Sequence, residues 1–140
     1  MDFHLVKIIE LDRVIVATSD IEMTKRNYEE LLDLSFAETE QLDEELGGLE
    51  LTFSYPGIEL IAPGDDDSPI AKYIDENGPG QYAVVFRVAD LAAAKDELSA
   101  KDVTPIIEVD ESEAPEAFYH PKDFDGVMVI LTEYSHPHGE

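Results

Sequence analysis

An arginine lies inside an otherwise apolar stretch near the N-terminus of the sequence. Arg13 opens "RVIVATSDIE", in which residues 14–17 are typical of a buried strand. A buried guanidinium without a partner costs several kcal/mol, so its presence in a strand requires an explanation. Arg13 is therefore a candidate functional group that would hold a carboxylate or a carbonyl oxygen of a ligand.

An internal repeat places further residues beside Arg13. At a shift of 70 residues, "RVIVATSDIEMTK" aligns with "AVVFRVADLAAAK", so that Arg13 matches Ala83 and Asp20 matches Asp90. Each copy is typical of a strand, a cap and a helix: Ser19 or Asp20 caps the first helix, with Glu22 completing a capping box after Ser19. We expect one domain over 1–140, with repeats at about 12–63 and 82–133.

The predicted elements give the same order in both halves. Helices are expected at about 20–34 and 90–101, each followed by three strands: "LSFAETEQL", "LELTFSY" and "IELIAP", then "TPIIEV", "APEAFYH" and "GVMVILTEY". A short helix lies between the halves, with Ser68 as its cap and Pro69 in its first turn. The fold class is α+β, with two βαβββ modules whose curved mixed sheets form a cleft and whose helices cover the outer faces.

The repeat also predicts which side chains line this cleft. Arg13 and Ala83 occupy equivalent first strands, and Glu59 and Ile130 occupy equivalent final strands. Glu59 is the expected partner of Arg13, and it would act as base or orienter. Further predicted positions are the apolar Ile15 and Met128 on the floor, Tyr82 at the rim, Arg87 along the strand of Ala83, and His120 and Lys122 in the turn "HPKD".

These segments resemble the vicinal oxygen chelate superfamily (glyoxalase, bleomycin resistance and extradiol dioxygenase relatives), and most of all its methylmalonyl-CoA epimerase branch. The similarity covers nearly the whole chain, and "SPIAKYI" and "HPKD" are its more specific motifs. The resemblance implies a divalent metal held by His, Glu or Gln, His and Glu. The matching residues here are Arg13, Glu59, Ala83 and Ile130, of which only Glu59 could be a ligand, so we expect no metal cofactor.

The resemblance also implies roles for residues outside the floor. Tyr82 stands where the epimerase branch often has a histidine. His120 and Lys122 would contact the acyl or phosphate part of a ligand, although they would equally well stabilise their turn. Glu45 lies near a second catalytic carboxylate of that branch, although a solvated acidic turn explains it as well.

Two classes of function follow from this pattern. The first is a metal-independent isomerase, epimerase or lyase acting on a small carbonyl compound or an acyl thioester. Arg13 would stabilise the oxyanion, and Glu59 or Tyr82 would move the proton. The alternatives are a non-catalytic binding protein for a small apolar or aromatic ligand, a metal-dependent epimerase despite the lost ligands, a structural subunit, and a dead site that an Arg13–Glu59 pair fills.

The composition limits the partners. The sequence has 33 Asp and Glu against 9 Lys and Arg, a formal net charge of -24 that disfavours nucleic acid and anionic membranes. It has no cysteine, which excludes thiolate chemistry, and no apolar run long enough to span a bilayer. We expect a cytoplasmic protein, a homodimer by analogy with the superfamily, and a small-molecule ligand. An acyl-CoA would need local bases such as Lys72, Lys122 and Arg87.

Overall fold

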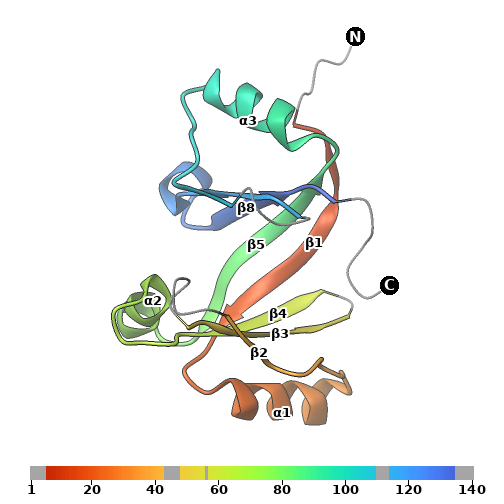
Figure 1. Ribbon diagram of the computed structural model, residues 1–140, viewed down its shortest axis with the longest axis vertical. Helices are drawn as coiled ribbons and strands as arrows, with labels where there is room; N and C mark the ends of the chain where they lie inside the picture. Colours follow the sequence, from red (N-terminus) through yellow and green to blue (C-terminus); the bar gives the residue numbers. More distant parts are fainter. Residues whose placement is uncertain (1–5, 43–47, 56, 110–113, 135–140) are drawn as a thin grey trace. The chain divides into compact units, whose positions relative to one another are not determined.

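The chain folds into two compact units (Figure 1). The computed structural model describes residues 6–42, 48–55, 57–109 and 114–134. Among the described residues, the first module comprises those within 14–82, and the second comprises 6–13 together with those within 83–134. The division falls inside the first strand, so Arg13 packs with the second module although Val14 packs with the first.

The first module contains β1 (Ile8–Ala17, from Val14), α1 (Ile21–Leu32), β2 (Glu40–Gln41), β3 (Glu50–Ser54), β4 (Ile58–Ala62) and α2 (Pro69–Asn77). Its strands lie in the order β2-β3-β4-β1. β1 and β4 are parallel, and the other pairs are antiparallel. Ile21, Leu60 and Ala62 form its core together with Val16 and Tyr28, so α1 covers the sheet face that carries Leu60.

The second module repeats this order. It contains β5 (Gly80–Val88, from Ala83), α3 (Leu91–Ser99), β6 (Ile107–Val109), β7 (Glu116–Tyr119), the 3-10 helix η2 (Pro121–Phe124) and β8 (Met128–Thr132). The strand order is β5-β8-β7-β6, with β5 and β8 parallel. Leu91 and Ala94 of α3 pack on Val88, Tyr119 and Leu131. The predicted α+β class with two βαβββ modules is therefore confirmed.

Most helix boundaries agree with the local sequence signals, but the predicted capping box was wrong. Asp20 and Asp90 are the N-caps of α1 and α3, and Ser68 with Pro69 begins α2 as predicted. The capping box does not form: the Asp20 carboxylate accepts from the Met23 amide, whereas Glu22 accepts from the Thr39 hydroxyl. Because the Asp20 carboxylate caps the helix, Ser19 lies one residue before the cap and takes no part in it.

The expected strand "LSFAETEQL" is mostly irregular. Only Glu40–Gln41 forms a strand, and Phe36 makes an isolated bridge to Ser54. The Ala37 amide donates to the Phe53 carbonyl, so the segment follows β3 through separate contacts. Both residues of β2 are exposed, and little apolar burial holds this edge in a regular ladder.

Among the described residues, the helices are too short and too polar for any of them to cross a membrane.

Candidate functional site

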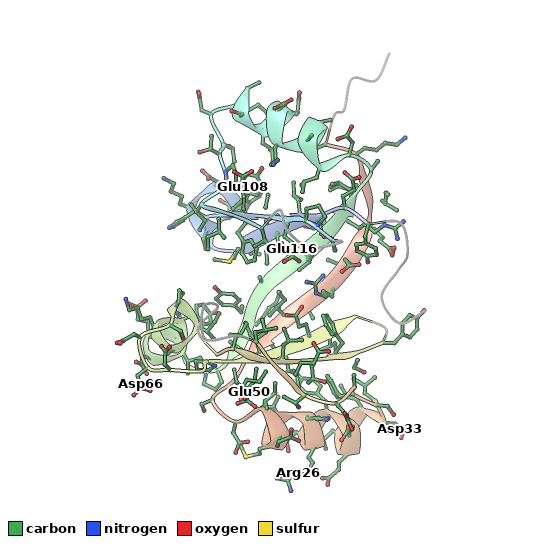
Figure 2. The ribbon with its side chains drawn as sticks, viewed as in Figure 1. Arg26, Asp33, Glu50, Asp66, Glu108 and Glu116 are labelled. Carbon is green, nitrogen blue, oxygen red and sulfur yellow. The ribbon has the colours of Figure 1, made fainter. Side chains whose placement is uncertain are left out.

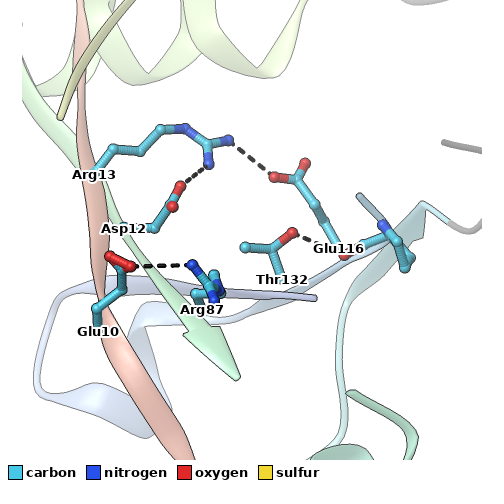
Figure 3. Close-up of polar contacts among 7 residues, drawn as sticks. Glu10, Asp12, Arg13, Arg87, Glu116 and Thr132 are labelled. Atoms are coloured by element: carbon cyan, nitrogen blue, oxygen red, sulfur yellow. Dashed lines mark hydrogen bonds and ion pairs between the residues drawn. The ribbon is translucent and has the colours of Figure 1, made fainter. Parts of the chain in front are cut away.

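Arg13 is a buried cation held by two carboxylates (Figure 3). Only 8% of the residue is exposed. Its Nη1 donates to Oδ2 of Asp12 at 2.6 Å, and its Nη2 donates to Oε2 of Glu116 at 2.9 Å. Such charge-assisted hydrogen bonds fix the plane of the guanidinium and offset its desolvation. We call Asp12, Arg13 and Glu116 the arginine cluster; all three belong to the second module.

The two carboxylates differ in their access to solvent. The Asp12 side chain is 3% exposed and the Glu116 side chain is 21% exposed. Sequence reasoning missed both residues. Glu116 carried one usable signal, because alternation along "EAFY" places it on the strand face opposite Ala117 and Tyr119, which belong to the core.

Strand register shows what surrounds Glu116 within its sheet. Glu116 pairs with Thr132, and Thr132 pairs with Arg87, so the three lie side by side on β7, β8 and β5. Phe118 and Val85 flank Ile130 in the next such row. This face is opposite the one that α3 covers, because Val84, Phe86, Val129 and Leu131 pack with the helix. Figure 2 shows Glu108 on the α3 side of the sheet and Glu116 on the other side.

The apolar positions predicted for this face are well buried. Ala83 is 1% exposed, Ile130 is fully buried, and Met128, opposite Ala83, is half-buried. This register brings Ala83, Met128 and Ile130 together on the sheet face that bears Glu116. The face is apolar in its middle and charged at the row of Thr132.

Arg87 lies on the face of Val85, as its spacing predicted. Its Nη1 donates to Oε2 of Glu10 at 3.2 Å, and its guanidinium carbon lies 5.0 Å from the centre of the Tyr134 ring. Nε is buried and finds no acceptor among the described residues. Arg87 is therefore largely committed to protein contacts, with one donor to spare.

Glu59 lies in the first module. It is 6% exposed and pairs in register with Ile15 of β1, while Ile130 pairs with Val85. Because Ile15 and Val85 are equivalent in the repeat, Glu59 and Ile130 occupy matching places, as the sequence predicted. The contact between Glu59 and Arg13 stays a prediction.

Tyr82 packs on α2 of the first module. Its ring lies edge-on to Tyr73 with 5.0 Å between ring centres. Burial raises the pKa of the Tyr82 hydroxyl above its ordinary value, and the neighbouring Tyr73 raises it further. A tyrosine with a raised pKa stays protonated near neutral pH, so Tyr82 is suited to donate a hydrogen bond and poorly suited to act as a base.

His120 supports the turn that precedes β8. Its Nδ1 accepts from the Lys122 amide at 2.9 Å and caps η2. Both side chains are exposed. The turn-stabilising role is thus present for His120, and ligand contact by either residue stays a prediction. Glu45 lies outside the described residues.

The four positions to which the resemblance assigns metal ligands do not suit a divalent ion. Arg13 is a cation that is already hydrogen-bonded to two carboxylates, and Ala83 and Ile130 carry no donor atom. A catalytic divalent site generally needs about three protein ligands. Within the described part of the chain, no three His, Cys, Asp or Glu residues gather closely enough to hold a metal.

Comparison with known proteins identifies the family. The sequence profile of the Glyoxalase/Bleomycin resistance protein/Dioxygenase superfamily matches residues 12–119. Mouse mitochondrial methylmalonyl-CoA epimerase is 31% identical over 91% of this chain and 74% of its own length. The ethylmalonyl-CoA/methylmalonyl-CoA epimerase of Cereibacter sphaeroides is 28% identical over 88% of this chain and 96% of its own.

A solved structure agrees with these relatives. The crystal structure of methylmalonyl-CoA epimerase from Mycobacterium tuberculosis superposes with a TM-score of 0.79 at 30% identity, covering 97% of this chain and 93% of that one. The chain therefore belongs to the glyoxalase, bleomycin resistance protein and dioxygenase superfamily, and its relatives there include methylmalonyl-CoA epimerases.

Proposed function

We propose that this protein is an isomerase of the epimerase type, which exchanges the proton on the carbon next to the carbonyl of an acyl-CoA thioester without a metal ion. The observation that carries the proposal is the buried guanidinium of Arg13, fixed by hydrogen bonds to Asp12 and Glu116. The similarity to epimerases that act on methylmalonyl-CoA and ethylmalonyl-CoA supports the reaction class.

The chemistry follows from the properties of a thioester. A base removes the proton from the α-carbon, and the C–H electron pair forms a carbon–carbon double bond while negative charge moves to the thioester oxygen. A proton returned to the opposite face of the α-carbon inverts its configuration. Hydrogen bonds from Arg13 would stabilise the enolate oxygen in a site of low dielectric, where such donors contribute about 3–4 kcal/mol each.

Arg13 would take over the charge stabilisation that a divalent ion supplies elsewhere in the family. A guanidinium is a weaker electrophile than a divalent ion, so we expect slow turnover or a substrate with an acidic α-proton. The sequence assigned the proton to Glu59 or Tyr82. The raised pKa of the Tyr82 hydroxyl favours a carboxylate over Tyr82 as the base.

Proton exchange in heavy water tests this function. The purified protein, treated with a chelator and then freed of it, is incubated with methylmalonyl-CoA or ethylmalonyl-CoA, and deuterium in the thioester is followed by mass spectrometry against an enzyme-free blank. We expect exchange that survives metal removal and is lost in Arg13→Ala. Activity that returns only with an added divalent ion would contradict the metal-independent mechanism.

A binding protein without catalysis is the second candidate. It is favoured by the apolar middle of the second-module sheet, where Ala83, Val85 and Ile130 offer no chemistry. Comparing Arg13→Ala with Glu59→Gln separates the two functions. An enzyme that uses both residues loses turnover in both variants, whereas a binder of an apolar or aromatic ligand loses affinity mainly in the first.

The remaining sequence expectations belong to the same proposal. We infer a homodimer by analogy with the superfamily, and we propose a cytoplasmic location. Lys72 and Lys122, both exposed, are the bases we propose for the phosphates of coenzyme A.

A further inference from the structure

We infer that Glu116 is the catalytic residue that carries the proton in the proposed reaction, and that Asp12 is a positioning residue for Arg13. The inference rests on the proposed function and adds a group that neither the sequence pattern nor the resemblance assigns. It begins from the arginine cluster, in which one guanidinium holds two carboxylates of different accessibility.

Asp12 cannot readily meet a ligand. Its side chain is 3% exposed, and its Oδ2 lies 2.6 Å from Nη1 of Arg13, the shorter of the two contacts in the cluster. A buried carboxylate in such a contact restrains the guanidinium and compensates its charge. Asp12 therefore sets the direction in which the remaining N–H groups of Arg13 point.

Glu116 is placed differently. With 21% of its side chain exposed, it can contact a ligand and exchange its proton with water. Its Oε2 accepts from Arg13, while Oε1 makes no hydrogen bond to any residue that the structure describes. A base must have a free lone pair within reach of the proton that it removes, and Oε1 satisfies the first of these requirements.

The contact with Arg13 brings base and electrophile together. Oε2 of Glu116 lies 2.9 Å from Nη2. In a thioester the α-carbon is bonded directly to the carbonyl carbon, so a carbonyl oxygen held by Arg13 would bring the α-carbon near the carboxylate that Arg13 already binds. One pair of residues thus supplies the two functions that enolate formation requires, which are a proton acceptor and a donor to the developing oxyanion.

Register explains how this carboxylate reaches the site. Ile130 on β8 occupies the position at which the resemblance implies a glutamate. Glu116 comes from the neighbouring strand β7, on the same sheet face, in the row next to Ile130. The strand adjacent to that position therefore carries a carboxylate on the same sheet face. The long side chain of Arg13 spans the remaining distance to it.

Proton transfer balances in this arrangement. Glu116 takes the α-proton as the C–H pair moves into the enolate, and Arg13 remains protonated throughout. The carboxylic acid so formed exchanges its proton with solvent and returns a proton or deuteron to the face of the α-carbon that it deprotonated, which gives isotope exchange. Inversion additionally requires a second proton donor on the opposite face. No oxidant, reductant or further reactant is needed.

Substitution of Glu116 tests the inference. Glu116→Gln keeps the size of the side chain and an oxygen that can accept from Arg13, but it cannot take a proton at neutral pH. We expect the rate of deuterium exchange into methylmalonyl-CoA at saturation to fall by about 10²–10⁴-fold, with KM changed less than about threefold. Glu116→Asp should recover part of the rate and should keep the acid limb of the pH–rate profile, which Glu116→Gln loses.

Glu108→Gln is the matched control. Glu108 lies on β6 of the same module, on the α3 side, and its ion pair is with Lys95. This variant should exchange at the wild-type rate. Circular dichroism melts of each variant separate loss of catalysis from loss of folding.

The outcomes distinguish this inference from the function on which it rests. Wild-type exchange that persists within about threefold in a folded Glu116→Gln variant would overturn the role of Glu116 and leave the proposed function standing. Absence of exchange in the wild-type protein, with methylmalonyl-CoA and ethylmalonyl-CoA alike, would overturn both. A rate lost in Glu116→Gln together with an equal loss in Glu108→Gln would also contradict a specific role for Glu116.

Discussion

Replacing Arg13 by methionine should strongly destabilise the fold, because the change leaves two carboxylates without their shared cation. Asp12, with 3% of its side chain exposed, bears most of the cost, whereas Glu116 at 21% can partly rehydrate. Removing one partner of a buried ion pair costs about 3–5 kcal/mol. That is a large part of the roughly 5–15 kcal/mol that holds a domain of this size folded.

Urea unfolding followed by circular dichroism at neutral pH measures this loss. The triple variant Asp12→Asn, Arg13→Met, Glu116→Gln should recover most of it, because no buried charge is then left uncompensated. Arg26→Met is the control, since Arg26 is exposed on α1 (Figure 2), and it should change stability by less than about 0.5 kcal/mol. A free energy of unfolding for Arg13→Met within about 1 kcal/mol of the wild-type value would refute the argument that Asp12 and Glu116 need Arg13 to compensate their charges.

Three further predictions concern the second module. The Tyr119 hydroxyl is buried without a hydrogen-bond partner among the described residues, so Tyr119→Phe should raise the free energy of unfolding by about 1 kcal/mol. Burial raises the pKa of this hydroxyl above its ordinary 10.0, so the unfolded chain ionises first and wild-type stability falls as pH rises above that value. Tyr119→Phe should remove this part of the alkaline loss, and a variant that unfolds at lower urea would contradict the argument. Asp90→Ala removes the cap of α3 and should cost about 1 kcal/mol in thermal unfolding, with Asp90→Asn nearly neutral. His120→Asn should keep the cap of η2 and the melting temperature of the protein. If KM for the CoA ester then rises, His120 contacts the ligand. If KM is unchanged, His120 only stabilises its turn.

Local signals predicted much of the fold. The equivalence of Asp20 and Asp90 is visible in the sequence, and both residues are N-caps. Each carboxylate accepts a hydrogen bond from the backbone amide three residues further along the chain. Ile21 and Leu91 follow them as the first helical residues, each 4% exposed. These features depend on residues within one turn, so composition and spacing suffice to find them. The sequence left the cap open between Ser19 and Asp20, because the choice depends on the extended backbone of Asp20, which spacing does not specify.

The candidate site was only partly predictable, because some of its contacts join residues that are far apart in the sequence. Alternation within each strand placed Ala83, Ile130 and Arg87 on one face, because that pattern is also local. Glu116 lies 103 residues from Arg13 in sequence, and its approach depends on β7 being second from β5 in the sheet. Asp12 was missed because strict alternation sends neighbouring side chains to opposite faces, yet its carboxylate meets the guanidinium of the next residue.

The charge of the arginine cluster has a thermodynamic consequence for any ligand. Asp12, Arg13 and Glu116 together carry one excess negative charge, so their contact with a ligand is sensitive to the charge of the acyl group. Salt screens charge repulsion, so a higher salt concentration should favour an acyl-CoA that bears its own carboxylate over one with a neutral acyl group. Calorimetric titrations of both esters at low and high salt would measure this difference directly.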